Sequence, residues 1–343
     1  MTVLPYSGVP IFNPDGTFRK EDDVVQGRSY SSNLTKLLKQ LPKLENLQKG
    51  KPPSPVMAHI SLTNYCNLTC SFCCFANRDI SEKMPTEKVL KALDSFRAVG
   101  VTGVEFTGGG EPSIHPDFKK IVRYAKDLGF SLGICTNAAR FGMDRPIKKD
   151  IVELFDWVRM GMYGFYEGYD YDLRVFEGTN CKPSAAYVWD ENLETSKNPN
   201  ITGEWTDVKN KRMLSKKFQT TENFIRMLDW VEENKIPCRI AFNAIKDVKE
   251  TAKDIETIRG IIHEYEEDRG RKLQSAFLSD FNFKGERRND HCYMHMVKPF
   301  LFTDGYVYAC PSAELSIENN YNYVPESQFA VCDVDGIIDF YSK

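Results

Sequence analysis

Short apolar segments alternate with amphipathic ones from residue 57 to residue 281, and this alternation restricts the fold more than any other feature. The apolar segments have the length of buried strands, and the segments between them carry apolar residues at helical spacing. In the first helical segment Val89, Leu93 and Phe96 share one face, and Gly100 follows the last turn. Strands that alternate with helices form βα units and a parallel sheet. Six strands are predicted, at residues 57–61, 103–106, 131–135, 157–163, 239–245 and 276–281.

Two segments depart from this alternation. Residues 1–55 are polar and contain several prolines, so we expect an N-terminal extension that ends in a linker at Lys51–Pro55. Residues 164–217 are rich in Tyr, Asn, Asp and Lys and show no sustained apolar period. A long irregular segment inside a domain is commonly a lid or a binding loop. Because it follows the carboxyl end of a strand, where parallel sheets bind ligands, we expect it to cover the active site.

The composition is ordinary for a globular protein, since 41% of the 343 residues are hydrophobic and 27% are charged. No segment approaches the ~20 apolar residues of a membrane span, and the first residues lack the order of a secretory signal. We therefore expect a cytoplasmic protein without a membrane partner. The 45 basic and 48 acidic residues give a net charge of −3, which argues against nucleic acid as a partner.

Ten cysteines are many for a reducing compartment, where thiols more often bind metals or catalyse than form disulfides. Cys66, Cys70 and Cys73 follow the first predicted strand in a C-x3-C-x2-C spacing, with Cys74 adjacent. Three soft thiolate ligands on a short loop can wrap an iron–sulfur cluster and leave one iron open. Zinc or plain buried thiols are the alternatives, although structural zinc sites usually draw on two separated ligand pairs.

This loop resembles the signature of the radical S-adenosylmethionine (SAM) superfamily, which is C-x3-C-x-aromatic-C after the first barrel strand. The resemblance implies that Cys66, Cys70 and Cys73 hold a [4Fe–4S] cluster and that Phe72 packs near the adenine of SAM. Cys74 lies outside the motif and is expected to be a packing residue.

A glycine-rich turn, Thr107–Pro112, follows the second predicted strand. Glycines permit close approach of the backbone to a ligand, and a carboxylate can accept hydrogen bonds from an ammonium group. In the family a GGE motif at this place binds the amino group of SAM. The resemblance therefore assigns that role to Gly109, Gly110 and Glu111.

The resemblance suggests further SAM contacts at the ends of the later strands. Asn137 belongs to a polar pair similar to one in the family, and Arg159 is expected to meet the SAM carboxylate. Asn243 is a similar expectation on the fifth strand. The chain departs from many relatives at Gly161, near which they carry a serine for the ribose. A solvated or packing role is the alternative for each of these residues.

The resemblance also implies the reaction. The open iron binds SAM through its amino and carboxylate groups, and one electron cleaves SAM to methionine and a 5′-deoxyadenosyl radical, which takes a hydrogen atom from the substrate. A one-electron donor such as flavodoxin or ferredoxin is an expected partner. The protein itself supplies orientation and the exclusion of water.

A second group of cysteines lies near the C-terminus. Cys292 and Cys310 flank Gly305 in a C-x12-G-x4-C spacing, and Asp304-Gly305 between apolar runs predicts a hairpin that brings the two cysteines to neighbouring ends. The spacing resembles the SPASM/twitch extension of radical SAM enzymes. Because the dense cysteine array of a full SPASM extension is absent, the resemblance implies the shorter twitch type, in which Cys292, Cys310 and Cys332 hold an auxiliary [4Fe–4S] cluster.

The fourth ligand of that cluster stays open at this point. The position is either vacant for substrate or filled by His291, His295 or Cys181. The alternative to an auxiliary cluster is that these cysteines are small buried hydrophobic residues.

Three other cysteines could return a hydrogen atom to a product radical, which is the task of a lone cysteine in radical SAM epimerases. Cys238 precedes its strand and is expected at the bottom of the barrel, and Cys135 is expected to face a helix. Cys181, inside the irregular segment, is the preferred donor. His59 lies within a strand and is expected to be a structural histidine.

The predicted organisation is an N-terminal extension at residues 1–55, a partial (β/α)6 barrel of the TIM type at 56–281 and a twitch extension at 282–343. The leading functional hypothesis is maturation of a peptide or natural product by dehydrogenation, epimerisation or cross-linking. Radical modification of a small molecule, amino sugar or nucleotide is the alternative. An electron-transfer or zinc-binding protein is the non-enzymatic rival, and neither needs an ammonium-binding motif beside its metal loop.

Overall fold

The computed structural model describes most of the predicted barrel and part of the C-terminal extension. The described residues are 43, 45–46, 49, 54–69, 73, 75, 80–138, 140, 147–162, 171, 173–189, 212–213, 221–242, 248–278, 297–309 and 330–342. Within them, no helix has both the length and the apolar character that crossing a bilayer requires.

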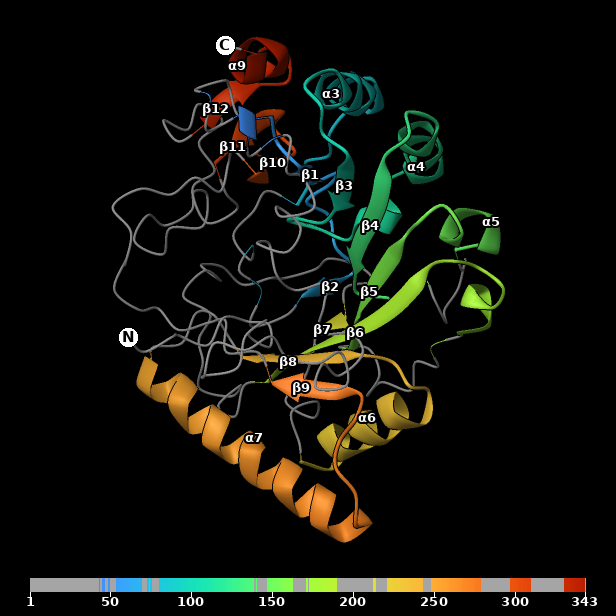
Figure 1. Cartoon of the computed structure of the whole chain (residues 1–343), viewed down its shortest axis with the longest axis vertical. Helices are drawn as coiled ribbons and strands as arrows, with labels where there is room; N and C mark the ends of the chain where they lie inside the picture. Colours follow the sequence, from blue (N-terminus) through green and yellow to red (C-terminus); the bar gives the residue numbers. More distant parts are fainter. Residues whose placement is uncertain are drawn as a thin grey trace.

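One sheet runs through the whole described structure (Figure 1). Its strand order is β12-β11-β10-β1-β3-β4-β5-β6-β8-β9, and the strands from β10 through β1 to β9 pair in parallel. The barrel strands are β1 (Met57–Ile60), β3 (Gly103–Phe106), β4 (Ser131–Thr136), β5 (Trp157–Gly161), β6 (Lys182–Trp189), β8 (Cys238–Phe242) and β9 (Ala276–Leu278). This arrangement confirms the predicted class, a partial α/β barrel of parallel strands.

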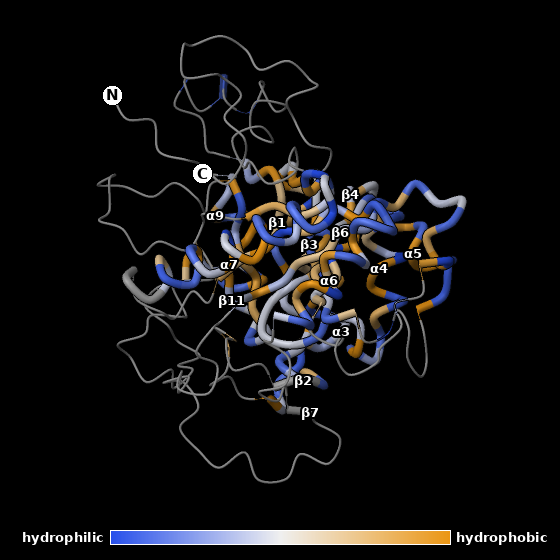
Figure 2. The backbone as a smooth tube through the Cα atoms, turned by 90° about the horizontal axis from the view of Figure 1, so that it is seen from below, coloured by the Kyte–Doolittle hydropathy of each residue, from blue (hydrophilic) through white to orange (hydrophobic). Residues whose placement is uncertain are grey.

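The helices connect these strands and cover the outer face of the sheet (Figure 1). They are α3 (Thr86–Ala98), α4 (Phe118–Asp127), α5 (Lys149–Val152), α6 (Thr221–Glu233) and α7 (Val248–Arg269), with short 3-10 turns η3 (Pro112–Ile114) and η6 (Leu173–Phe176). Val89, Leu93 and Phe96 of α3 are fully buried, as their spacing predicts. Figure 2 shows the hydrophobic stretches gathered where strands and helices pack together.

The predicted irregular segment at 164–217 contains a strand of the sheet, so this part of the prediction is wrong. Strand β6 lies between β5 and β8 and pairs in parallel with both. Tyr187 and Trp189 of β6 are buried against Phe224 of α6. The alternation of these large residues with smaller ones is the strand period, but the polar sequence on either side obscures it. The sheet therefore has one more parallel barrel strand than the sequence predicted.

Part of the same segment contacts the cysteine loop. The short strand β7 (Arg212–Met213) pairs in parallel with β2 (Leu68–Thr69), which lies between Cys66 and Cys70. The segment thus reaches the carboxyl-end side of β1. Residues 190–211 and 214–217 lie outside the described residues.

The C-terminal extension continues the barrel sheet. It contributes β10 (Phe300–Leu301), β11 (Tyr306–Tyr308), β12 (Ala330–Asp333) and α9 (Ile337–Ser342). The predicted hairpin is confirmed, because β10 and β11 are antiparallel and Gly305 in their turn has φ +86°. Strand β10 pairs with β1, so the extension is joined to the barrel through backbone hydrogen bonds.

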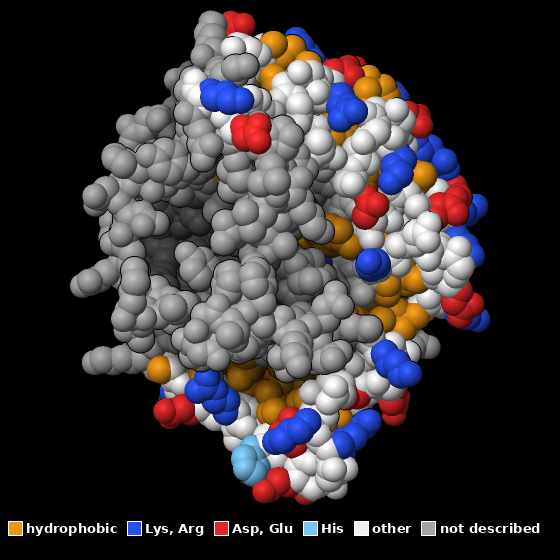
Figure 3. Space-filling view, viewed as in Figure 1, with side chains coloured by type: hydrophobic (Ala, Val, Ile, Leu, Met, Phe, Trp, Pro, Cys, Tyr) orange, Lys and Arg blue, Asp and Glu red, His pale blue; other side chains and the backbone are white. Residues whose placement is uncertain are grey.

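Charged side chains of both signs are interspersed over the described part of the face shown in Figure 3. This distribution agrees with the near balance of 45 basic and 48 acidic residues.

Candidate active site at the carboxyl ends of the barrel strands

The loop after β1 carries the N-terminal cysteine motif. Cys66 and Cys73 are half-buried in it, and neither forms a disulfide within the described chain. Cys70, Cys74 and Phe72 lie outside the described residues. The far end of the loop is held by Phe75, whose ring stacks on Phe302 of the extension at a centroid distance of 5.8 Å.

The glycine-rich loop after β3 packs against the backbone that leads into Cys66. The N–H of Glu111 donates to the carbonyl of Tyr65 at 2.9 Å. A Cβ added to Gly110 would overlap the carbonyl oxygens of Tyr65 and Thr63. The two loops can meet because position 110 has no side chain.

The carboxylate of Glu111 joins the ends of β3 and β4. It is 1% exposed, and it accepts hydrogen bonds from Ser113 N at 3.1 Å, Thr136 Oγ1 at 2.7 Å and Asn137 N at 2.7 Å. Burial raises its pKa, and these hydrogen bonds oppose the rise. The side chain therefore fixes the shape of the predicted SAM-binding loop. Among the described residues Oε2 accepts one hydrogen bond, so it can accept another.

Asn137 lies directly beside the cysteine loop. Its side-chain nitrogen Nδ2 is 3.6 Å from Cys66 Sγ and 2.6 Å from Asn67 Oδ1. The structure thus brings together Cys66, Glu111 and Asn137, which the sequence analysis placed in one site. Asn243 lies outside the described residues.

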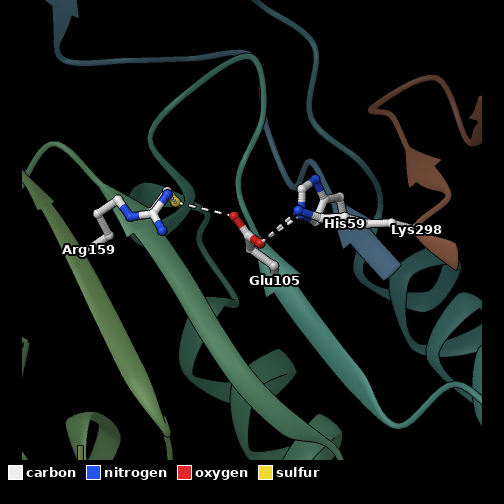
Figure 4. Close-up of polar contacts among 5 residues, drawn as sticks. His59, Glu105, Arg159 and Lys298 are labelled. Carbon is white, nitrogen blue, oxygen red and sulfur yellow. Dashed lines mark hydrogen bonds and ion pairs between the residues drawn. The ribbon is translucent and has the colours of Figure 1, made fainter. Parts of the chain in front are cut away.

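A second polar group lies deeper in the barrel, on the face of the sheet opposite the helices (Figure 4). Phe106 contacts Phe118 of α4, so Glu105, one residue earlier, points to the other face.

The carboxylate of Glu105 is 2.7 Å from His59 Nε2 and 3.4 Å from Lys298 Nζ, and it accepts a hydrogen bond from Cys135 Sγ at 3.3 Å. The Arg159 guanidinium lies beside Cys135, with Nη1 4.0 Å from the sulfur. We call these five residues the polar layer.

Charges within the polar layer fix two protonation states. Burial alone would raise the pKa of Glu105, but the positive charges of His59 and Lys298 outweigh it and hold the pKa well below its ordinary value. Burial and then the Glu105 charge raise the pKa of the Cys135 thiol to about 12. Cys135 is therefore a protonated thiol at neutral pH, and a protonated thiol is a poor nucleophile.

The expectation that Cys135 faces a helix is wrong, because its sulfur contacts Glu105 in the polar layer. Cys238 fits its prediction better. It begins β8 at the amino end, and its sulfur lies 3.7 Å from Met227 Sδ of α6.

The predicted hydrogen donor Cys181 is at the wrong end of the barrel. It immediately precedes β6, next to Lys182, which pairs with the first residue of β5. The 8 residues of β6 span about 26 Å at ~3.3 Å per residue, and they separate Cys181 from the carboxyl ends that carry Cys66 and Glu111. Burial and then the charge of Asp156 raise its pKa to about 12. This placement contradicts the donor role, and the error follows from the missed strand. The alternative role as a ligand of the auxiliary cluster stays a prediction, because Cys292 and Cys310 lie outside the described residues.

Cys332 lies on the face of the extension that packs against the main hydrophobic core. Its role as an auxiliary-cluster ligand stays a prediction, because the other two cysteines of the pattern are outside the described residues. Cys332 pairs with Val307 and packs with it against the main hydrophobic core beneath the helices. Phe300 and Tyr308 point to the other face, where they pack with Phe75 of the cysteine loop. Burial raises the pKa of Cys332 to about 12. Cys292, Cys310, His291 and His295 lie outside the described residues.

The sequence analysis did not select Glu105 or Lys298, and it treated His59 only as structural. The signal that could have found Glu105 is its position between Val104 and Phe106, because a charge flanked by buried residues in a strand points to the opposite face. No local sequence pattern predicts the role of Lys298, because its contact with Glu105 depends on the pairing of β10 with β1.

The residues of the loop suit an iron–sulfur cluster in the respects that the structure describes. The donors are soft thiols on one short loop, and an N–H donor lies beside one of them. The described residues bring no three metal ligands together, since Cys70 is not among them.

Comparison with known proteins agrees with the motifs. Residues 60–168 match the family model of the Radical SAM superfamily. A 98-residue stretch is 31% identical to an S-adenosylmethionine-dependent nucleotide dehydratase of Selenomonas ruminantium, covering 29% of this chain and 35% of that protein. A stretch of 84 residues is 31% identical to the sporulation killing factor maturation protein SkfB of Bacillus subtilis, covering 24% of this chain and 20% of that protein. The matched stretches thus span about a third or less of these relatives.

The fold is shared over a longer range. The structure of Streptococcus suis SuiB bound to its precursor peptide SuiA superimposes with a TM-score of 0.53. The alignment covers 94% of this chain and 73% of that one at 18% identity. At this identity the likeness establishes the common fold.

Proposed function

We propose that this chain, a member of the radical SAM superfamily through its residues 60–168, reductively cleaves SAM and uses the resulting 5′-deoxyadenosyl radical to abstract a hydrogen atom from a substrate. One observation carries the proposal. The hydrogen bond from Glu111 N to Tyr65 O locks the GGE loop onto the residue that precedes Cys66. The two loops that the reaction requires are therefore adjacent at the carboxyl ends of neighbouring strands.

Cys66, Cys70 and Cys73 would hold a [4Fe–4S] cluster, which supplies the electron that cleaves SAM and an open iron that chelates it. The chain's own residues position the cosubstrate. The backbone at Gly109 and Gly110 would approach the cosubstrate closely, Glu111 keeps the loop in shape, and the polar layer lies on the inner face of the same strands. A one-electron donor such as flavodoxin or ferredoxin completes the system.

Maturation of a peptide or natural product is the substrate class that we favour. It is supported by the similarity to SkfB, whose name is that of a maturation protein, and by the fold shared with a SuiB that binds a precursor peptide. The similarity to a nucleotide dehydratase supports the alternative, radical modification of a nucleotide or other small molecule. Among the peptide reactions, the interior thiol of Cys135 favours epimerisation, because a protonated thiol can return a hydrogen atom.

We further propose that the C-terminal extension holds an auxiliary [4Fe–4S] cluster through Cys292 and Cys310. The confirmed hairpin turn at Gly305 supports this, since its spacing to Cys310 is that of the twitch pattern. The part of the segment 164–217 that follows β6 and includes β7 is proposed to cover the bound SAM, and the pairing of β7 with β2 supports this lid.

Electron paramagnetic resonance (EPR) of anaerobically reconstituted protein tests the proposal. After reduction with dithionite, we expect a cluster signal that changes when SAM is added, because SAM binds the open iron. Cys66→Ala should lose that signal. A spectrum that is identical with and without saturating SAM would refute SAM binding at the cluster.

A further inference from the structure

Asn137 is held rigidly between the two loops of the site. It follows β4, and its backbone N–H donates to Glu111 Oε2 at 2.7 Å. The next residue, Ala138, has φ 60°, and its N–H donates to Thr136 Oγ1 at 3.0 Å, so a tight turn fixes the backbone here. The residue is 9% exposed. Its side chain is therefore almost completely enclosed.

The amide of Asn137 presents its nitrogen to the cysteine loop. Nδ2 carries two hydrogens, and two acceptors lie near it among the described residues of that loop, Asn67 Oδ1 at 2.6 Å and Cys66 Sγ at 3.6 Å. The reverse orientation would place the amide oxygen against another oxygen and against a sulfur that is negative when it binds metal. Both contacts thus select the same orientation of the amide.

A hydrogen bond to a cluster thiolate acts on the cluster electronically. It stabilises negative charge on the sulfur, and the reduced cluster carries one more negative charge than the oxidised one. Hydrogen bonds to the sulfurs are among the factors that set the reduction potentials of iron–sulfur clusters. We propose that Asn137 is a positioning residue that raises the reduction potential of the N-terminal cluster by donating a hydrogen bond to Cys66. This inference rests on the proposed function, in which Cys66 is a cluster ligand.

The role differs from the SAM contact expected from the sequence. It also links the cluster to the cosubstrate, because the same residue binds Cys66 with its side chain and Glu111 with its backbone. A change at the SAM-binding loop can therefore reach the cluster through one residue. An amide at this position would make the cluster easier to reduce before SAM is cleaved.

An EPR-monitored redox titration without SAM or substrate tests the inference. It is carried out in a Cys292→Ser/Cys310→Ser background, so that only the N-terminal cluster contributes to the signal. Asn137→Asp keeps the shape of the side chain but removes its N–H donors, and Asn137→Leu removes all side-chain hydrogen bonding. Both should lower the ratio of reduced to oxidised cluster about tenfold at a fixed potential, equivalent to about 59 mV for one electron. The matched control is Asn67→Ala, which removes the second acceptor and leaves the contact with Cys66. It should change the ratio less than about twofold.

The outcomes separate this inference from the proposed function. If Cys66→Ala keeps the titrating signal, the ligand assignment and with it the proposed function fail. If Cys66→Ala loses the signal and both Asn137 variants titrate like the wild type, only this inference is overturned. If neither Asn137 variant assembles a cluster, Asn137 acts in assembly rather than on the potential, and the inference is likewise overturned.

Discussion

Gly110 shows how one residue sets the distance between two loops of the site. Its Cα lies where any side chain would overlap the backbone carbonyls of Tyr65 and Thr63. Changing it to alanine must push the cysteine loop and the GGE loop apart. We expect Gly110→Ala to lose the SAM-dependent change of the EPR signal, and to bind less iron after reconstitution because Cys66 shifts with Tyr65.

The matched control is Gly260→Ala in the middle of α7, where an added Cβ meets nothing within 4 Å. That variant should bind iron and SAM normally and gain up to about 1 kcal/mol from helix propensity. Normal SAM binding by Gly110→Ala would show that the two loops do not need this close approach.

Glu105 makes the stability of the protein depend on pH. In Glu105→Gln the side chains of His59 and Lys298 lose their buried carboxylate partner, and breaking a buried ion pair costs about 3–5 kcal/mol. The pKa of Glu105 is lower in the folded than in the unfolded chain, so its stabilisation is present above the ordinary value near 4.5 and is lost as pH falls through the folded value. The difference in the free energy of unfolding between wild type and variant should therefore become smaller below pH 4.5.

Urea unfolding of the cluster-free protein at neutral and acidic pH measures this difference. Asp150→Asn, which removes the exposed partner of Arg123, is the control and should change stability by less than about 1 kcal/mol. A difference for Glu105→Gln that widens on acidification would contradict the assignment of an ionised carboxylate.

Sequence motifs located the cysteine loop and the GGE loop of the site but not the polar layer. Cys66, Gly110 and Glu111 belong to contiguous motifs whose spacing is tied to one chemistry, so they can be recognised without a structure. The polar layer combines single residues from β1, β3, β4, β5 and the segment before β10, and only strand pairing brings these together. The inward direction of Cys135 follows from its register opposite Arg159.

At the scale of elements, the missed strand β6 explains the misplacement of Cys181. Most barrel strands could be predicted because each is a short apolar run followed by an amphipathic helix. Strand β6 instead has the sequence KPSAAYVW and is flanked by polar residues. Because of these flanking residues, the sequence pattern predicted an irregular segment. The place of β6 in the sheet comes from pairing with β5 along its first part and with β8 along its last part. Such contacts between distant segments cannot be read from the local sequence.

The two faces of the extension lead to a prediction about the auxiliary cluster. Cys332 packs beneath the helices, whereas the other face of β10 and β11 carries the aromatic residues that meet the cysteine loop. We expect Cys332→Ser to keep the iron content of the wild type, about eight irons per chain for two clusters. Cys292→Ser and Cys310→Ser should each reduce it to about four. Halved iron in Cys332→Ser would show that Cys332 is a ligand.

At the scale of the whole molecule, the extension and the barrel form one continuous sheet. Strand β10 covers the edge of β1, Lys298 enters the polar layer, and Phe302 stacks on Phe75 of the cysteine loop. The extension thus supports the N-terminal site directly. A change in the extension should therefore alter the stability of the N-terminal cluster.

Phe75→Ala tests this connection. Removing the half-buried ring from its stack with Phe300 and Phe302 should cost about 1–3 kcal/mol and speed the loss of iron from the N-terminal cluster to a chelator. Phe340→Ala is the control, because that ring is 42% exposed and its loss should cost much less. Equal rates of iron loss in the two variants would show that the extension does not support the loop.

Formation of 5′-deoxyadenosine tests the central claim most directly. Protein reconstituted anaerobically and reduced with dithionite should convert SAM to 5′-deoxyadenosine and methionine, measured by mass spectrometry. The Cys66→Ala, Cys70→Ala and Cys73→Ala variants should form neither product, whereas Cys238→Ala, whose sulfur packs against Met227 at the opposite end of the barrel, should be active. Undiminished formation of 5′-deoxyadenosine by a variant that lacks all three loop cysteines would contradict the account.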